Sequence, residues 1–194
     1  MTGDDFGLPI HSPRLKRVFE HWWQARGNRL MPVWRDICPA KIKAELPIVW
    51  SFRYDATQDE FFGGIAGDAI QRLLGGPIKG VQFRKIQGAD THLFARAKRV
   101  LIKPAIFVGR GLLFRQRDRQ CYGERLMLPF AGLDGRAGGV FGATDYRFAF
   151  LYTSGHESRG EVEYWADLKA SGHLLPTRFW DGGCCSGSDA AEMP

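Results

Sequence analysis

The sequence predicts an α+β fold in which a sheet of five strands carries several helices. The first observation is a segment in which every second side chain is apolar or aromatic, so that one face of a strand would carry Ile48, Trp50, Phe52 and Tyr54. The second is an apolar helical face near the N-terminus, and the third is a set of strand-like segments beyond residue 105. Two strands alone are not stable, so the later segments must complete the sheet.

Composition favours one domain with appendages. The 194 residues are 44% hydrophobic and 13% aromatic, enough for one sizeable core. No segment is typical of a membrane span, and residues 1–5 have neither a basic leader nor an apolar run. We therefore expect a cytoplasmic protein without membrane insertion. None of the cysteines has metal-ligand spacing, although the adjacent pair leaves a redox role open: Cys38, Cys121, Cys184 and Cys185.

The formal charge of +6 is unevenly distributed. From Arg96 to Arg125 the chain has nine Lys or Arg residues against Asp118 and Glu124. Such a basic stripe could bind phosphates. Strand-period alternation of the basic side chains favours a solvent-facing sheet surface instead.

The first expected helix begins after a loose arm of residues 1–12. Ser12 can cap it and Pro13 suits its first turn, and the helix would run to about Ala25 before Gly27 ends it. Its large apolar face would either pack into the core or form a dimer or partner interface. The residues of this candidate interface are Leu15, Val18, Phe19, Trp22 and Trp23.

A linker and a compact strand pair follow. We expect, in order, an extended linker (28–39), a short helix (40–45), strands (48–55 and 60–67) and a helix (69–74) that Asp68 caps and residues 75–77 end. Residues 78–87 suit either a short helix or a loop.

The C-terminal half predicts a longer helix and the remaining strands. The helix spans residues 90–103 before Pro104, and the strands are 106–119, 122–130 and 138–148. Leu112, Phe114, Leu126, Leu128 and Phe130 would point inward. A helix is expected at 161–170, and residues 181–194 have the composition of a disordered tail.

Several motifs recur in a known order: Arg29, Pro32, Asp36, Ile37, Pro39, Ile42, Leu46 and Pro47; then Ile65, Ala66, Gly67, Gly75 and Gly80; and finally Glu124, Leu126, Leu128, Pro129 and Phe130. Together they resemble a bacterial family of small PAS-like proteins, many without an attached catalytic domain. The resemblance implies a five-stranded antiparallel sheet with helices across one face, plus an N-terminal amphipathic helix. Phe62, Gly63 and Gly64 depart from the family pattern and suggest a bulge or a close ligand approach.

On this basis we divide the chain into four parts: an arm and amphipathic helix (1–26), a PAS-like domain (27–148), a C-terminal extension (149–180) and a disordered tail (181–194). A ligand cavity would lie between the sheet and the helices of residues 69–101. Its expected apolar lining is Trp50, Phe52, Phe62, Ile65, Ile70, Leu74, Phe83, Leu93 and Phe114, and the polar candidates are Tyr54, His92 and Gln116. Each could instead be an ordinary core or surface residue.

The resemblance implies a sensory, signalling or protein-interaction module without catalysis. It would bind a small apolar or mixed ligand or a signalling protein partner, and we expect a homodimer. The cofactor is unknown: haem would depend on His92, and Phe83 stands where light-sensing relatives carry a reactive cysteine. No catalytic motif is present. The alternatives are a nucleic-acid-binding protein that uses the Arg96–Arg125 stripe and a small enzyme.

Overall fold

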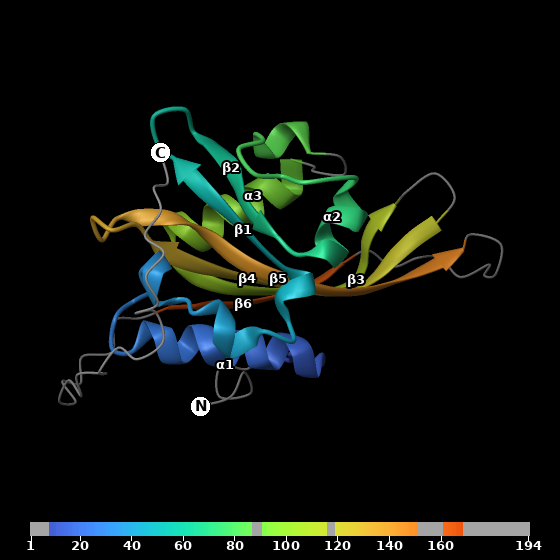
Figure 1. The fold of residues 1–194 in the computed structure, drawn as a ribbon, viewed down its shortest axis with the longest axis horizontal. Coiled ribbons are helices and arrows are strands. Elements are labelled where there is room, and N and C mark those ends of the chain that lie inside the picture. Colours follow the sequence, from blue (N-terminus) through green and yellow to red (C-terminus); the bar gives the residue numbers. More distant parts are fainter. Residues whose placement is uncertain (1–7, 87–90, 116–118, 151–160, 169–194) are drawn as a thin grey trace.

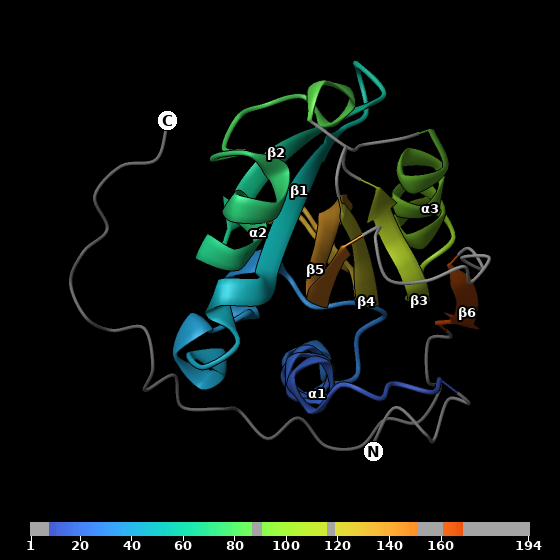
Figure 2. The same ribbon diagram turned by 90° about the vertical axis from the view of Figure 1, so that its right-hand side faces the viewer.

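The computed structural model describes residues 8–86, 91–115, 119–150 and 161–168. Their strands form one antiparallel sheet in the order β2-β1-β5-β4-β3-β6. Helix α1 covers one face, and α2 and α3 cover the other (Figures 1 and 2). The expected α+β architecture is confirmed, but the sheet has six strands where five were predicted.

The bounds of the elements are as follows. The α-helices are α1 (Pro13–Arg26), α2 (Asp68–Leu74) and α3 (Thr91–Ile102), and the short 3₁₀ helices are η2 (Trp34–Asp36), η3 (Pro39–Ile42), η4 (Leu46–Ile48) and η5 (Phe83–Lys85). The strands are β1 (Val49–Asp55), β2 (Glu60–Ala66), β3 (Ala105–Arg115), β4 (Arg119–Ala131), β5 (Ala137–Phe150) and β6 (Val162–Asp167). The expected helix at 40–45 is therefore a 3₁₀ turn, and the described part of the ambiguous segment 78–87, residues 78–86, contains η5.

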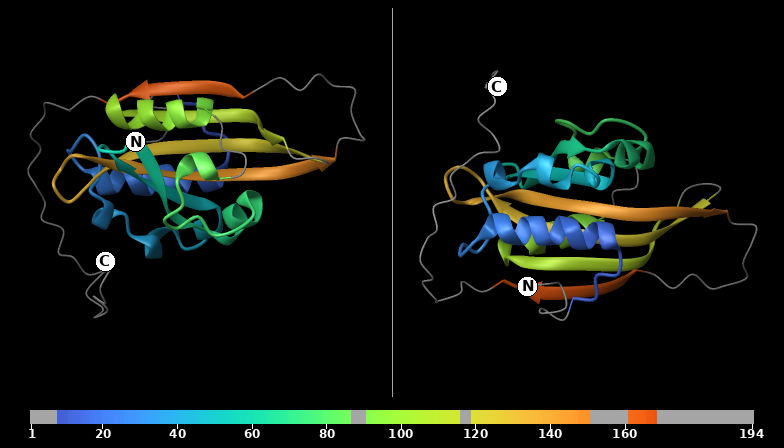
Figure 3. Two further views of the ribbon diagram at one scale, coloured as in Figure 1. Left: turned by 90° about the horizontal axis from the view of Figure 1, so that it is seen from above. Right: turned by 60° about the horizontal axis from the view of Figure 1, so that its bottom comes forward.

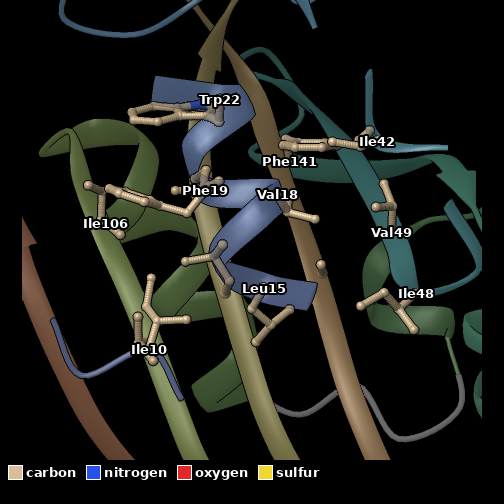
Figure 4. Close-up of a cluster of buried hydrophobic side chains, with 14 of the residues drawn as sticks. Ile10, Leu15, Val18, Phe19, Trp22, Ile42, Ile48, Val49, Ile106 and Phe141 are labelled. Carbon is tan, nitrogen blue, oxygen red and sulfur yellow. The ribbon is translucent and has the colours of Figure 1, made fainter. Parts of the chain in front are cut away.

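Helix α1 lies along the sheet on the face opposite α3, as the right-hand view of Figure 3 shows. Its apolar side chains point into the sheet (Figure 4), and Trp22 Nε1 donates a hydrogen bond to the Pro129 carbonyl at 2.9 Å. The fully buried residues of this face are Leu15, Val18, Phe19 and Trp22, and Trp23 packs against them half-buried. The prediction of an exposed interface on this helix is therefore wrong. These side chains are buried because they form the apolar cover of the second face of the sheet.

The first two strands meet at a bulge. Trp50 pairs with Ala66 but Phe52 pairs with Gly63, so the register shifts between them. The Ser51 hydroxyl accepts the Ile65 N–H at 3.1 Å inside this irregularity. The expectation of a bulge at the paired glycines is therefore confirmed. Ile48 lies before β1, in η4, and joins the core under α1 instead of the face that carries Trp50.

Strand β6 replaces the helix expected at 161–170, which is wrong. It pairs antiparallel with β3, and its side chains alternate between the two cores: Tyr164 and Ala166 join the α1 side, and Trp165 joins the α3 side. Trp165 lies edge-on to Phe107 with ring centres 4.8 Å apart. The segment that was expected to be helical therefore contains a strand that is partly buried on both sides and pairs with the edge of β3. The expected tail at 181–194 lies outside the described residues.

Candidate functional site

A cavity of about 40 Å³ lies between the sheet and the helices on the α3 side. Strands β1, β3, β4 and β5 contribute one side of it, and α2, the η5 region and α3 contribute the other. Apolar side chains dominate the wall. The lining residues are Trp50, Phe52, Ile70, Leu73, Leu74, Phe83, Ile86, Leu93, Ala97, Phe114, Arg125, Met127 and Thr144.

The structure brings most of the expected lining together at this cavity: Trp50, Phe52, Ile70, Leu74, Phe83, Leu93 and Phe114. Aromatic contacts organise this group. The ring of Phe52 lies 5.6 Å from that of Trp50 and 4.9 Å from that of Phe83. Aromatic residues from β1, on the sheet side, and from the η5 region, on the helix side, thus meet at the cavity.

The remaining candidates lie elsewhere. Ile65 is 42% exposed and His92 is exposed, so neither reaches the cavity. Phe62 and Tyr54 line a separate surface hollow at the β1–β2 turn. Gln116 lies outside the described residues. The bulge explains why Ile65 does not face the cavity. The register shift that precedes it interrupts the alternation of side chains from which its inward position was predicted.

Tyr54 serves the hairpin and not the cavity. Its hydroxyl donates a hydrogen bond to Asp59 Oδ1 at 2.6 Å, and Lys98 of α3 pairs with the other oxygen at the same distance. The hydrogen bond to Asp59 raises the pKa of Tyr54 to about 12. This chain of contacts fastens the β1–β2 turn to α3.

Two polar lining residues were missed, and both lie on strands. Thr144 and Arg125 share the cavity face with Met127, whereas the residues expected to point inward from β4, such as Leu126 and Leu128, face α1. A sheet covered on both faces buries both alternating sets of side chains. Apolar residues occur in both alternating sets of β4, and this pattern could have indicated that both faces of the strand are buried.

Thr144 is engaged with the aromatic wall. Its Oγ1 accepts a hydrogen bond from Trp50 Nε1 at 2.9 Å, and both residues are buried. The hydroxyl fixes the indole orientation, because a buried indole N–H without an acceptor is costly. The pair therefore sets the shape of one end of the cavity.

Arg125 is a buried cation in the same wall, with 2% of its surface exposed. Its Nη2 donates a long hydrogen bond to the Leu113 carbonyl at 3.4 Å, and its guanidinium lies 4.7 Å from the ring centre of Phe114. Nη1 is 3.9 Å from Oε2 of Glu161. The same Glu161 oxygen accepts a 2.8 Å hydrogen bond from Arg96 of α3. A buried ionic network thus joins the cavity wall, α3 and the start of β6.

Of the nine basic residues between Arg96 and Arg125, four have partners within the fold or are buried, whereas Lys103, Arg110 and Arg115 are exposed. Arg96 pairs with Glu161 and Glu163, Lys98 pairs with Asp59, and Arg99 lies over the Trp165 ring. Arg125 is buried. These contacts give internal partners to part of the charge, and the nucleic-acid alternative stays a prediction that rests on the exposed basic residues.

The described part of the chain contains no group of three or more His, Cys, Asp or Glu residues placed to hold a metal ion. Among the helices of the described ranges, none is long and apolar enough to cross a membrane.

Comparison with known proteins gives one result. Residues 10–144 match a family model whose description is PAS domain. The match includes α1, both cavity-covering helices and most of β5, and it ends before β6. No curated protein and no solved structure matched the sequence.

Proposed function

We propose that this chain, which belongs to the PAS domain family, binds a small molecule in the cavity beneath α2 and α3 and passes the bound state on to a protein partner. PAS domains are in general sensory, signalling or interaction modules. In this proposal the chain acts by binding and catalyses no reaction itself.

The cavity is the observation that carries the proposal. It lies between the two layers of the fold and is partly open, its wall is almost entirely apolar, and Thr144 and Arg125 are the polar residues among those that line it. This combination is typical of small-molecule sites. A water needs about 10–15 Å³ of such space, so about 40 Å³ corresponds to a ligand of only a few heavy atoms. A haem or flavin would require large movements of the surrounding side chains.

The test is to look for a molecule that co-purifies with the protein. Rapidly desalted protein is denatured, and the released compounds are identified by mass spectrometry. Ala97, a small buried residue of the wall, offers a variant that fills the space: Ala97→Leu. Ala95→Leu, at an exposed position of the same helix, is the matched control.

We expect a compound of few heavy atoms from the wild type and from Ala95→Leu, and its loss from Ala97→Leu. Circular dichroism checks that both variants fold. Equal release from all three proteins would place the compound outside the cavity and contradict the proposal.

Partner binding without a ligand is the second candidate function. Ile102 at the end of α3 is 55% exposed and borders a surface hollow with Lys103, Pro104 and Leu168. Apolar side chains that are grouped on the surface, as Ile102, Pro104 and Leu168 are in this hollow, are a feature of interaction surfaces. Loss of partner capture in Ile102→Asp, with no ligand released from the wild type, would favour this candidate.

A further inference from the structure

The side chains that bring N–H or O–H groups to the cavity wall are engaged with other parts of the protein. Of the residues that line the cavity, these are Trp50, Arg125 and Thr144. The indole of Trp50 donates its N–H to the hydroxyl of Thr144 at 2.9 Å. The Arg125 guanidinium lies over the ring of Phe114 and pairs with Glu161. The polar groups of the wall thus serve the fold, and the surface that a ligand meets is almost entirely that of carbon atoms.

A wall of this kind favours apolar molecules over water and over polar solutes. Water inside a protein is held by about two to four polar partners, whereas apolar cavities in other proteins take benzene or xenon. A polar ligand group would give up its hydrogen bonds to water and find few replacements here, which is unfavourable. One water occupies about 10–15 Å³ of such space, so the volume of about 40 Å³ corresponds to about three heavy atoms.

We infer that the cavity takes an uncharged apolar molecule, a short hydrocarbon of the size of propane. This inference rests on the proposed function, because it names the chemical class of the ligand for the same cavity. Removal of the hydrocarbon from water and its dispersion contacts with the wall supply the affinity. Carboxylates, amines and alcohols fall outside the class, because each would bring a polar group to a wall of carbon atoms.

The helices over the cavity connect the bound state to the surface of the protein. Helix α2 lines the cavity with Ile70, Leu73 and Leu74, and α3 lines it with Leu93 and Ala97. A hydrocarbon between these helices and the sheet adds apolar contacts to both layers. Helix α2 has only 7 residues, so its stability depends on packing and not on its own length. Ligand binding therefore slows the local opening of α2.

The test compares propane with ethanol, which has nearly the same shape but carries a hydroxyl in place of one methyl group. Binding is measured by NMR titration at constant pH, with propane supplied under pressure, and the methyl signals of Ile70 and Met127 report on the cavity. We expect saturable shifts with propane and at least tenfold weaker binding of ethanol. Hydrogen exchange of the α2 amides should be slower at saturating propane than without it.

Two substitutions of one residue fill the cavity by different amounts. Ala97→Leu should abolish propane binding, and Ala97→Val should weaken it at least threefold. The smaller variant carries the test if leucine is too large for the fold, which circular dichroism checks. Ala95→Leu, at an exposed position of the same helix, is the matched control and should bind propane as the wild type does.

Three results would overturn the inference, and they have different meanings. Ethanol binding as tight as that of propane, with loss of both in Ala97→Leu, would refute the apolar class while leaving a ligand-binding cavity in place. Propane binding that neither Ala97 variant changes would place the hydrocarbon outside the cavity. Failure of the folded wild-type protein to bind either compound would refute the inference and would also count against the proposed function.

Discussion

The carboxylate of Glu124 on β4 accepts the backbone N–H of Ser12 at 2.7 Å, although 112 positions separate the two residues in the sequence. The same carboxylate accepts the His11 N–H at 3.0 Å, and Glu124 is only 4% exposed. Ser12 in turn accepts the Leu15 N–H and donates its hydroxyl to Asp145 of β5. Two strands of the sheet therefore determine where α1 begins.

Glu124→Ala should detach this start of the helix. It leaves two part-buried backbone N–H groups without their acceptor, and a fully buried donor without an acceptor costs about 1–3 kcal/mol. We expect the free energy of unfolding, measured with urea, to fall by at least about 2 kcal/mol. Glu124→Gln keeps one acceptor oxygen and should lose clearly less. Equal stability of the two variants would show that the carboxylate does not anchor the helix.

Trp22→Ala should destabilise the core without changing the oligomeric state. Trp22 is fully buried and donates to Pro129, so its removal creates a large cavity and should cost about 3–5 kcal/mol. Trp23→Ala, at the half-buried neighbour, should cost clearly less. Sedimentation of folded Trp22→Ala should equal that of the wild type, and dissociation of a dimer at unchanged stability would restore the interface interpretation.

Local patterns predicted several element boundaries in the first half of the fold. The alternation in β1, the cap and proline at the start of α1, and the glycine that follows α2 each act within a few residues. At the end of α2, Gly75 adopts a left-handed conformation, with φ of 82°, that favours glycine. The pattern predicted these boundaries because their causes are local.

Strand β6 and Arg125 were missed because their causes are distant. Six residues of mixed polarity are compatible with the period of a helix and with that of a strand. Residues 162–167 form a strand because they pair with the edge of β3. Arg125 was assigned to solvent on the assumption that the sheet has one buried face. Helix α1 covers the second face, so both alternating sets of β4 are buried. The aromatic face of α1 was a signal of this in the sequence, as were the apolar residues in both sets of β4.

Gly63→Ala and Gly109→Ala should differ in cost although both introduce the same methyl group. A Cβ on Gly63 would lie 1.9 Å from the Ile78 backbone oxygen, so the segment beside β2 must move, and overpacking of this kind costs about 1–3 kcal/mol. On Gly109 the equally close atom is Oε1 of the Glu161 side chain, which can rotate away. We expect a larger fall in the urea midpoint for Gly63→Ala. The reverse order would mean that the Glu161 network is the more rigid of the two contacts.

His21 should make stability depend on pH. This α1 residue is 7% exposed, and its Nε2 accepts the Cys38 backbone N–H at 3.0 Å, which requires a neutral ring. Burial, and secondly the positive charge of Lys41, lower the pKa of His21. The unfolded chain, with a histidine pKa near 6.5, therefore binds the proton more readily than the folded protein.

The resulting stability is fully present above about pH 6.5 and is lost as the pH falls toward the lowered pKa of the folded state. His21→Gln keeps an acceptor for Cys38 but cannot titrate. Urea unfolding at about pH 7.5, 6.5 and 5.5 should show a steeper decline for the wild type than for His21→Gln, because every other titrating group is common to both proteins. Parallel curves would mean that the ring accepts a proton as easily in the folded protein as in the unfolded chain, and that its hydrogen bond to Cys38 does not restrict it.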